Sequence, residues 1–293
     1  NIRLMGIFDY KKLESNNFAE IIDLFGGSGY LNVDSFDNFQ FDLQNPDRIV
    51  GEGEKFRYNF NLYANVMSAT AQAFFKYNKV DFYMAASYTS TEYQREGIYQ
   101  NEAFADNSFG KGRKLKFNGL GLKGGATYKI TGKHLIDIND AYVNRAPSLR
   151  NTYSNSRENH DVVGDRSGND ITEEKISSVD ASYIFRSPTV KARLTGFYTT
   201  IQDANEISFF FADGIGGDNA NFVQEILQGI NKKHLGAEFG IEAQVTSTIK
   251  LKGAASVGQY TYDNNPNLYL TTTPDPSAPD ELGQNGFKDF GEA

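Results

Sequence analysis

The chain has 293 residues, a net charge of −8 at pH 7, no cysteine and a mean hydropathy of −0.50. The absence of cysteine excludes a disulfide scaffold and thiolate metal ligands, and the acidic balance argues against nucleic acid as a partner, since phosphate binding needs clustered Lys and Arg. No segment reaches the roughly 18 uninterrupted apolar residues of a membrane-spanning helix, which excludes a helical membrane protein.

Residues 1–55 are expected to form an extracellular loop region with a short helix. Asn17 is a suitable N-cap, and Gly26 and Gly27 would end the helix. One face of this expected helix carries Phe18, Ile21, Ile22 and Phe25. The spacing predicts a helix that packs onto the surrounding loops.

Residues 56–262 are expected to form barrel hairpins joined by long loops. A strand between lipid and a watery lumen alternates apolar and polar side chains over about 9 to 11 residues. Hairpins of this kind occur at residues 67–88, 120–145, 178–198 and 234–258. Their turns fall at Asn78, Gly132, Pro188 and Ser247, which we expect at one rim, with Arg95, Asn155 and Gly216 at the opposite rim.

The hairpin at residues 234–258 shows the alternation most clearly. The side chains expected to face lipid are Phe239, Ile241, Leu251 and Val257. Those expected to face the interior are Glu238, Glu242 and Lys250. A slip of one residue would exchange the two faces, so the pattern fixes the register of this hairpin.

The register near Asp140 is less clear. If Arg145 points into the lumen with Asp137, parity places Asp140 among the apolar side chains of Ile136 and Ile138. An acidic side chain facing lipid is unfavourable unless a bulge or the membrane interface relieves it, so the sequence leaves both arrangements open.

Short turns on one side and long polar loops on the other are typical of bacterial outer-membrane barrels. Residues 263–293 are expected to be a further extracellular loop leading to strands outside this chain. A soluble sandwich or barrel also alternates, but its turns would recur about every 8 to 12 residues. The sequence therefore indicates an all-β fold, a transmembrane antiparallel up-and-down β-barrel with long extracellular loops and about eight clear strands here.

Several segments resemble, in order and spacing, the barrel of TonB-dependent outer-membrane receptors. They are residues 144–149 (NRAPSL), 169–183 (NDITEEKISSVDASY), 194–203 (LTGFYTTIQD) and 231–242 (NKKHLGAEFGIE). Residues 51–56 (GEGEKF) and 93–100 (YQREGIYQ) look like the Bacteroidota branch, whose members often carry a carboxypeptidase-like regulatory domain. Thr172 and Glu173 depart from the usual Lys and Pro, which affects the local turn but not the strand.

The resemblance implies a barrel of about 22 strands around an N-terminal plug. It also implies active uptake of a large, scarce nutrient such as a siderophore, cobalamin, glycan or peptide, with outer-membrane lipid, the plug, the TonB complex and a surface lipoprotein as expected partners. The alternative is a non-transporting outer-membrane barrel that serves in assembly, adhesion or secretion. A plug and a TonB box in the longer protein would distinguish the two.

Ligand contacts in such a barrel must come from the lumen and the loops, because lipid occupies the outer face. The candidates in the lumen are Arg145, Glu238 and Glu242, and those in the loops are Tyr93, Arg95, Tyr99, Phe209, Phe210 and Phe211. We expect the long loops after Tyr88, Arg145, Ile201 and Tyr262 to form the ligand entrance.

Signals of catalysis or cofactor binding are weak. Gly119, Gly121 and Gly124 spell G-x-G-x-x-G, but they lie within an alternating strand with no helix after them to receive a pyrophosphate. The histidines, His134, His160 and His234, show no metal-ligand spacing. We therefore expect no enzyme, no cofactor and no metal site.

Overall fold

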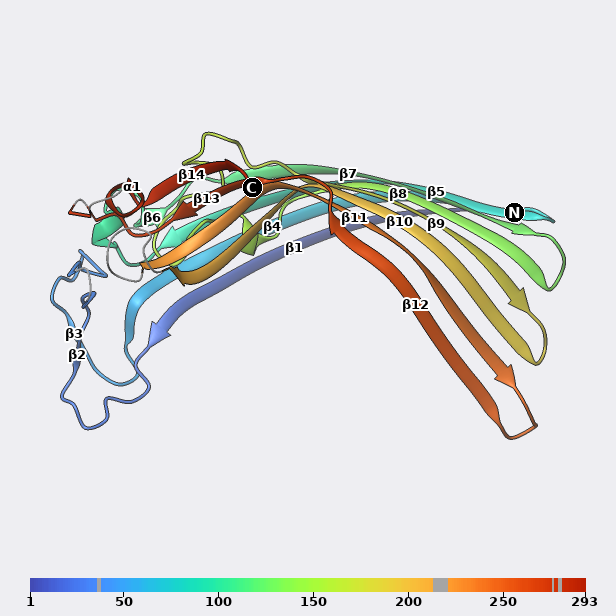
Figure 1. Ribbon diagram of the computed structural model, residues 1–293, viewed down its shortest axis with the longest axis horizontal. Coiled ribbons are helices and arrows are strands. Elements are labelled where there is room, and N and C mark those ends of the chain that lie inside the picture. The colour runs from blue at the N-terminus through green and yellow to red at the C-terminus, as the bar shows by residue number, and fades with distance from the viewer. Residues whose placement is uncertain (36–37, 213–220, 276, 279–280) are drawn as a thin grey trace.

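The computed structural model describes residues 1–35, 38–212, 221–275, 277–278 and 281–293. The chain is all-β, and its long strands form one antiparallel up-and-down sheet with the curvature of a barrel wall (Figure 1), while two short strands form a separate pair. The strands follow each other in space as β1 (Ile2–Glu20), β4 (Lys55–Lys76), β5 (Val80–Gly97), β7 (Leu115–Lys129), β8 (His134–Arg145), β9 (Glu174–Arg186), β10 (Val190–Ala212) and β11 (Asn221–Gln244).

The sheet divides at β11, because two different strands pair with its two halves. β12 (Lys250–Tyr262) pairs with residues 232–244, whereas β13 (Asn267–Thr271) pairs with residues 224–228. β14 (Phe287–Glu292) then pairs with β13. In Figure 1, β12 consequently diverges from the short β13–β14 pair, which lies at the opposite end of the sheet.

One end of the sheet, here called the turn end, carries the short connections. The four predicted turns lie there, and each is closed by a backbone hydrogen bond such as Ser187 N to Val190 O at 2.7 Å. The opposite loop end carries the long connections, with the short elements β2 (Tyr30–Leu31), β3 (Ile49–Val50), η1 (Glu102–Phe104), β6 (Gly110–Lys111), η2 (Leu149–Asn151) and α1 (Glu281–Asn285). Arg95 and Asn155 lie at this end as expected, while Gly216 falls outside the described residues.

The predicted short helix in residues 1–55 is wrong, because this region begins with the long strand β1. Its residues pair with β4 from Ile2 opposite Phe75 to Glu20 opposite Lys55. The helical spacing covers few residues, and isolated short helices are marginal in water. Pairing with the whole length of β4 satisfies the backbone far better. Ile22 and Phe25 follow the strand and are 89% and 93% exposed.

Two strands extend further toward the loop end than the alternation predicts. β5 continues to Gly97 and β10 to Ala212, so Tyr93, Arg95 and the run Phe209–Phe211 lie in strands rather than in loops. Register shifts after Ile201 and around Gly229, which has φ +75°, interrupt the β10–β11 ladder. Bulges of this kind break the two-residue period that identifies a strand from sequence.

The predicted division of the β11–β12 hairpin into an apolar and a polar face is confirmed by the register, whereas contact of the apolar face with lipid and of the polar face with the interior stays a prediction. Phe239 lies opposite Leu194 and Ala255, and Glu242 lies opposite Lys191 and Lys252. The same parity continues across the sheet, which gives an apolar face with Phe239 and a polar face with Glu242. The apolar face is well exposed, with Leu194 at 51% and Val257 at 73%.

The structure resolves the register around Asp140. β8 pairs with β7 and with β9 without a shift, so Asp140 lies opposite Gly124 and Val179. Its carboxylate therefore belongs to the apolar face, and no bulge relieves its position. The Asp140 carboxylate has no hydrogen bond or ion pair with any other described residue.

Candidate functional site

The candidate site combines the polar face of the sheet with the loops at its loop end. Glu242 is the centre of a charged group near the turn end. Its carboxylate lies 3.0 Å from Lys250 Nζ, 3.6 Å from Lys252 Nζ and 3.9 Å from Lys191 Nζ. Arg186 and Arg193 line the same shallow groove of about 590 Å³. Basic side chains outnumber acidic ones there, so this wall would attract an anionic group.

Glu238 lies closer to the middle of the sheet, in a more neutral stretch of the polar face. Its neighbours across the ladder are Thr195 and Ser256. Hydroxyl pairs cross the neighbouring strands, with Ser182 Oγ 2.9 Å from Thr195 Oγ1. These groups donate and accept hydrogen bonds, so they suit a polar solute better than an apolar one.

Arg145 lies at the start of the loop end and forms an ion pair with the next strand. Its Nε donates to Glu174 Oε2 at 2.8 Å, and the Glu174 side chain is only 8% exposed against 59% for Arg145. The exposed guanidinium can still meet a solute. Glu174 is the partner that fixes its position.

Arg95 is 1% exposed and is held by two loops. Its Nε donates to Ser156 O at 2.7 Å, and its Nη1 donates to Ser108 O at 3.0 Å and to His160 Nδ1 at 3.0 Å. Tyr93, on the same strand, donates its hydroxyl to Pro147 O at 3.1 Å. Both candidates therefore hold loops in place in this structure, and contact of either with a ligand stays a prediction.

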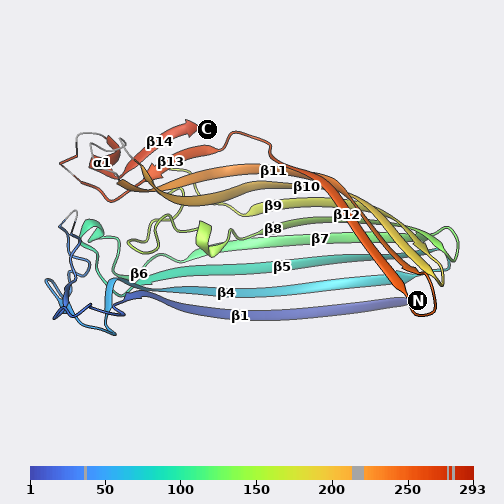
Figure 2. The same ribbon diagram turned by 60° about the horizontal axis from the view of Figure 1, so that its bottom comes forward.

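Residues 146–173 connect β8 to β9 and are here called the crossing loop. The loop begins in the middle of the sheet and contacts strands on both sides. Val162 belongs to a cluster with Tyr153 of the loop itself and with Ala64, Tyr93, Leu115 and Phe117 on the β4–β5–β7 side. Its neighbour Val163 packs with Ile207, Ile226 and Tyr269 on the β10–β11–β13 side. Figure 2 shows this yellow-green segment between the ribbons of β7 and β10.

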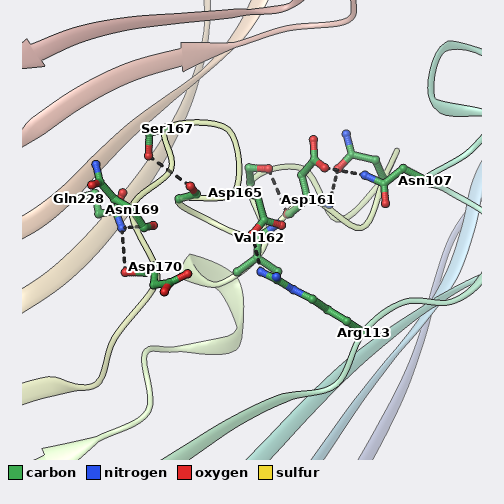
Figure 3. A network of polar contacts seen from close by, with 12 residues as sticks. Asn107, Arg113, Asp161, Val162, Asp165, Ser167, Asn169, Asp170 and Gln228 are labelled. Atoms are coloured by element: carbon green, nitrogen blue, oxygen red, sulfur yellow. Dashed lines mark hydrogen bonds and ion pairs between the residues drawn. The ribbon is translucent and has the colours of Figure 1, made fainter.

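Polar contacts reinforce this packing (Figure 3). On one side Asn107 Nδ2 donates to Asp161 Oδ1 at 2.5 Å, and Arg113 forms an ion pair with Asp165. On the other side Gln228 Nε2 donates to the backbone carbonyl of Asn169 at 3.1 Å. The close-up shows Gln228 of β11 on one side of the loop and Asn107 and Arg113, from the connections next to β6, on the other.

His160 is the titratable group at the centre of these loop contacts. Its backbone N donates to Asn107 O at 2.9 Å, and its Nδ1 accepts from Arg95. With Nδ1 as acceptor, the ring proton is on Nε2, which lies 3.4 Å from Phe109 O. Burial, followed by the nearby positive charge of Arg95, lowers the pKa of His160 below its ordinary value.

The aromatic candidates occupy two separate places. Phe209 and Phe211 lie on β10 and contact Phe222, with ring centroids 5.9 Å and 5.1 Å apart. Phe211 is 72% exposed, so the cluster offers an apolar surface. Tyr99, in contrast, donates its hydroxyl to Lys55 O at 2.9 Å and is half-buried.

The sequence reasoning did not identify the residues that anchor the crossing loop. Val162, Val163, Arg113 and Asp165 lie in segments without periodicity, and their partners are far away along the chain. Two adjacent valines in a polar loop were the only local signal, since large aliphatic side chains favour burial.

Among the described residues, no helix is long and apolar enough to span a membrane. The same residues contain no group of three or more His, Asp or Glu side chains arranged to hold a metal ion. Positions outside the described ranges do not enter either statement.

No protein-family model matches the chain, and no curated protein matches its sequence. Among solved structures, the chain is similar in fold to the copper transporter OprC, with a TM-score of 0.58 and 13% sequence identity. The match covers 92% of this chain and 38% of the transporter. The chain thus corresponds in length to well under half of that protein, and the likeness shows the fold.

Proposed function

We propose that the chain is part of the barrel of a TonB-dependent outer-membrane receptor that takes up a large solute. The two-faced sheet is the observation that carries this proposal. One face exposes aliphatic side chains, with Tyr128 toward the turn end and Tyr88 and Tyr198 toward the loop end. Tyrosines at both ends of an apolar belt are typical of strands that cross a bilayer.

The polar face would then line the lumen. It presents Glu238, Glu242 and the surrounding lysines, and the loop end presents Arg145 and the aromatic cluster of Phe209, Phe211 and Phe222. A solute arriving from outside would meet the loops first and this wall afterwards. The motif resemblance, and not these contacts, supports a plug and a TonB partner, and the Bacteroidota branch rests only on residues 51–56 and 93–100.

Copper is the solute named for OprC. The hydroxyl-rich stretch around Glu238 suits a hydrated polar solute, and the basic group around Glu242 suits one with an anionic part. A surface lipoprotein partner stays a prediction, and the exposed Ile22 and Phe25 on the first long loop would be available to it.

The orientation can be tested by labelling single cysteines in the full-length protein in intact cells. An impermeant maleimide should modify Ile22→Cys, which replaces an 89% exposed side chain at the loop end. It should modify Asn78→Cys, in a turn, only after the cells are broken. The reverse pattern would invert the barrel and refute the assignment of the loops to the cell exterior.

Active transport needs a separate experiment on the intact gene. A strain that lacks the gene should lose growth on one large nutrient, and the complete gene should restore it. A version without the TonB box should not. Full restoration by that version would refute energy-coupled uptake and leave the non-transporting barrel as the better reading.

A further inference from the structure

We infer that the crossing loop is a fixed constriction of the barrel mouth, which sets the size of solute that can reach the polar wall. This inference deepens the proposed function and rests on it. Such a constriction differs from a mobile lid, because the loop is anchored to both sides of the sheet at the same time.

The first anchor is on the β4–β5–β7 side. Arg95 binds the loop through Ser156 and His160, and its 1% exposure leaves no solvent to replace those bonds. Hydrogen bonds to a charged group are stronger than those between neutral groups, so several of them together hold the loop firmly. Tyr93, which donates to Pro147 O, adds a bond at the start of the loop.

The second anchor is on the β13–β14 side. The backbone N of Gly164 donates to the Tyr269 hydroxyl at 2.8 Å, and Arg166 Nη2 donates to Asn285 O at 2.5 Å. The Arg166 guanidinium also lies 5.2 Å from the Phe287 ring centroid. Tyr269 and Asn285 lie more than one hundred residues further along the chain. Tyr269 and Phe287 are on β13 and β14, strands remote from β5 in the sheet, and Asn285 is the last residue of α1.

The link between the anchors is short and stiff. Val162 and Val163 are each 1% exposed, yet each packs with a different side of the sheet. Gly164 follows with φ +93°, and a Cβ there would lie 1.6 Å from Asn169 O. Moving the loop away from one wall therefore requires breaking the packing against the other. A solute must pass beside the loop rather than displace it.

The test measures access to the wall beneath the loop with reagents of two sizes. Ser178→Cys, on the polar face of β9, serves as the only cysteine of the full-length protein in intact cells. A small impermeant maleimide and a large polyethylene-glycol maleimide are compared. Loosening variants are Arg95→Met at the first anchor and Val163→Asp at the second. Arg150→Met is the control, because Arg150 is an exposed side chain of the same loop that makes no hydrogen bond or ion pair with another described residue.

The small reagent should label every version at similar rates. The large reagent should label the parent and Arg150→Met slowly, and both loosening variants at least about tenfold faster, since each 1.4 kcal/mol of lost anchoring changes the open population tenfold. Heat-modifiable mobility on gels confirms that each variant is folded. If one loosening variant does not assemble, the other still decides the result.

Three results would overturn the inference. The large reagent could label the parent as fast as the variants, neither reagent could label any version, or the Arg150→Met control could behave like the loosening variants. Failure of the proposed function is distinguishable, because it would appear as loss of external labelling at Ile22→Cys, a position outside the crossing loop.

Discussion

At the scale of single residues, Asp140 is the clearest departure from the pattern around it. It lies between Gly124 and Val179 on a face that is otherwise apolar across the neighbouring strands. Ionisable side chains at such positions are rare in membrane proteins because their burial in lipid is unfavourable.

We predict that Asp140→Leu stabilises the assembled full-length barrel by about 1 to 2 kcal/mol, since acidic side chains cost less than Arg or Lys at the midplane. Urea unfolding in lipid vesicles measures the change. Asp137→Leu on the polar face is the matched control and should destabilise, because it removes a contact of 2.5 Å with Thr127 Oγ1. A loss of stability for Asp140→Leu would mean that the carboxylate has a partner in the intact protein.

His160 predicts a pH dependence of the crossing loop. Its folded pKa is lowered by burial and by Arg95, so the stability it contributes is complete above the unfolded pKa of about 6.5 and is lost as the pH falls through the folded pKa. Asp161 acts in the opposite sense at lower pH, since burial raises its pKa. Glu158 and Arg113 also lie near this site, and Glu158 favours the Arg95 charge.

Hydrogen exchange of residues 153–165 should therefore become faster as the pH is lowered from neutral to about 5, after correction for the intrinsic exchange rate. His160→Phe should abolish this pH-dependent change in the exchange rate, because phenylalanine keeps an aromatic ring at the position but does not titrate. If the exchange rate of this variant still rises as the pH is lowered, another group is responsible for the pH dependence.

At the scale of elements, Gly164 shows how the crossing loop depends on one backbone conformation. We predict that Gly164→Ala releases the loop at a cost of more than about 2 kcal/mol, because φ is positive and the new Cβ would overlap Asn169 O. Gly168→Ala is the control, since φ is +77° but no atom lies within 4 Å of the added Cβ, and it should cost only about 1 kcal/mol. Limited proteolysis of the loop ranks the two variants, and equal cleavage would contradict the packing described here.

The β11–β12 hairpin allows the faces to be tested with neighbouring positions. Phe239→Arg should destabilise barrel assembly by roughly 2 to 4 kcal/mol if the apolar face meets lipid near the midplane. The arginine side chain of Gly240→Arg would point to the polar face. An added Cβ there has no atom within 4 Å, so this variant should be tolerated. Folding yield in vesicles compares them. Equal losses of folding yield in the two variants would show that neither face contacts lipid.

The strands were predictable where apolar and polar side chains alternate along the sequence. The hairpins at residues 67–88, 120–145, 178–198 and 234–258 have alternating side chains, and all are present. β1 was missed because residues 1–55 were expected to be a loop region, and the helix expected there from Phe18, Ile21 and Ile22 overlaps only the last residues of the strand. The extension of β10 was missed because bulges interrupt its ladder with β11, whereas β5 continues without a register shift but carries polar residues on both faces beyond Tyr88.

At the scale of the whole molecule, the candidate site was only partly predictable. Glu238 and Glu242 follow from parity, so the sequence places them on the polar face. The burial of Tyr93 and Arg95 depends on a loop that returns across the sheet, and no local pattern specifies where such a loop docks. Long-range packing determines these positions, and the sequence alone does not show which distant residues pack together.

The position of the crossing loop in the chain has a consequence for the order of assembly. The loop is made after β8, but Tyr269, which binds Gly164, follows 105 residues later. Contacts at such separations form late, because the closure of long chain segments opposes them. The hairpins can pair one after another as they emerge, while the loop waits for β13. Its docking is therefore a late step in folding, and it reports that the wall on both sides has been completed.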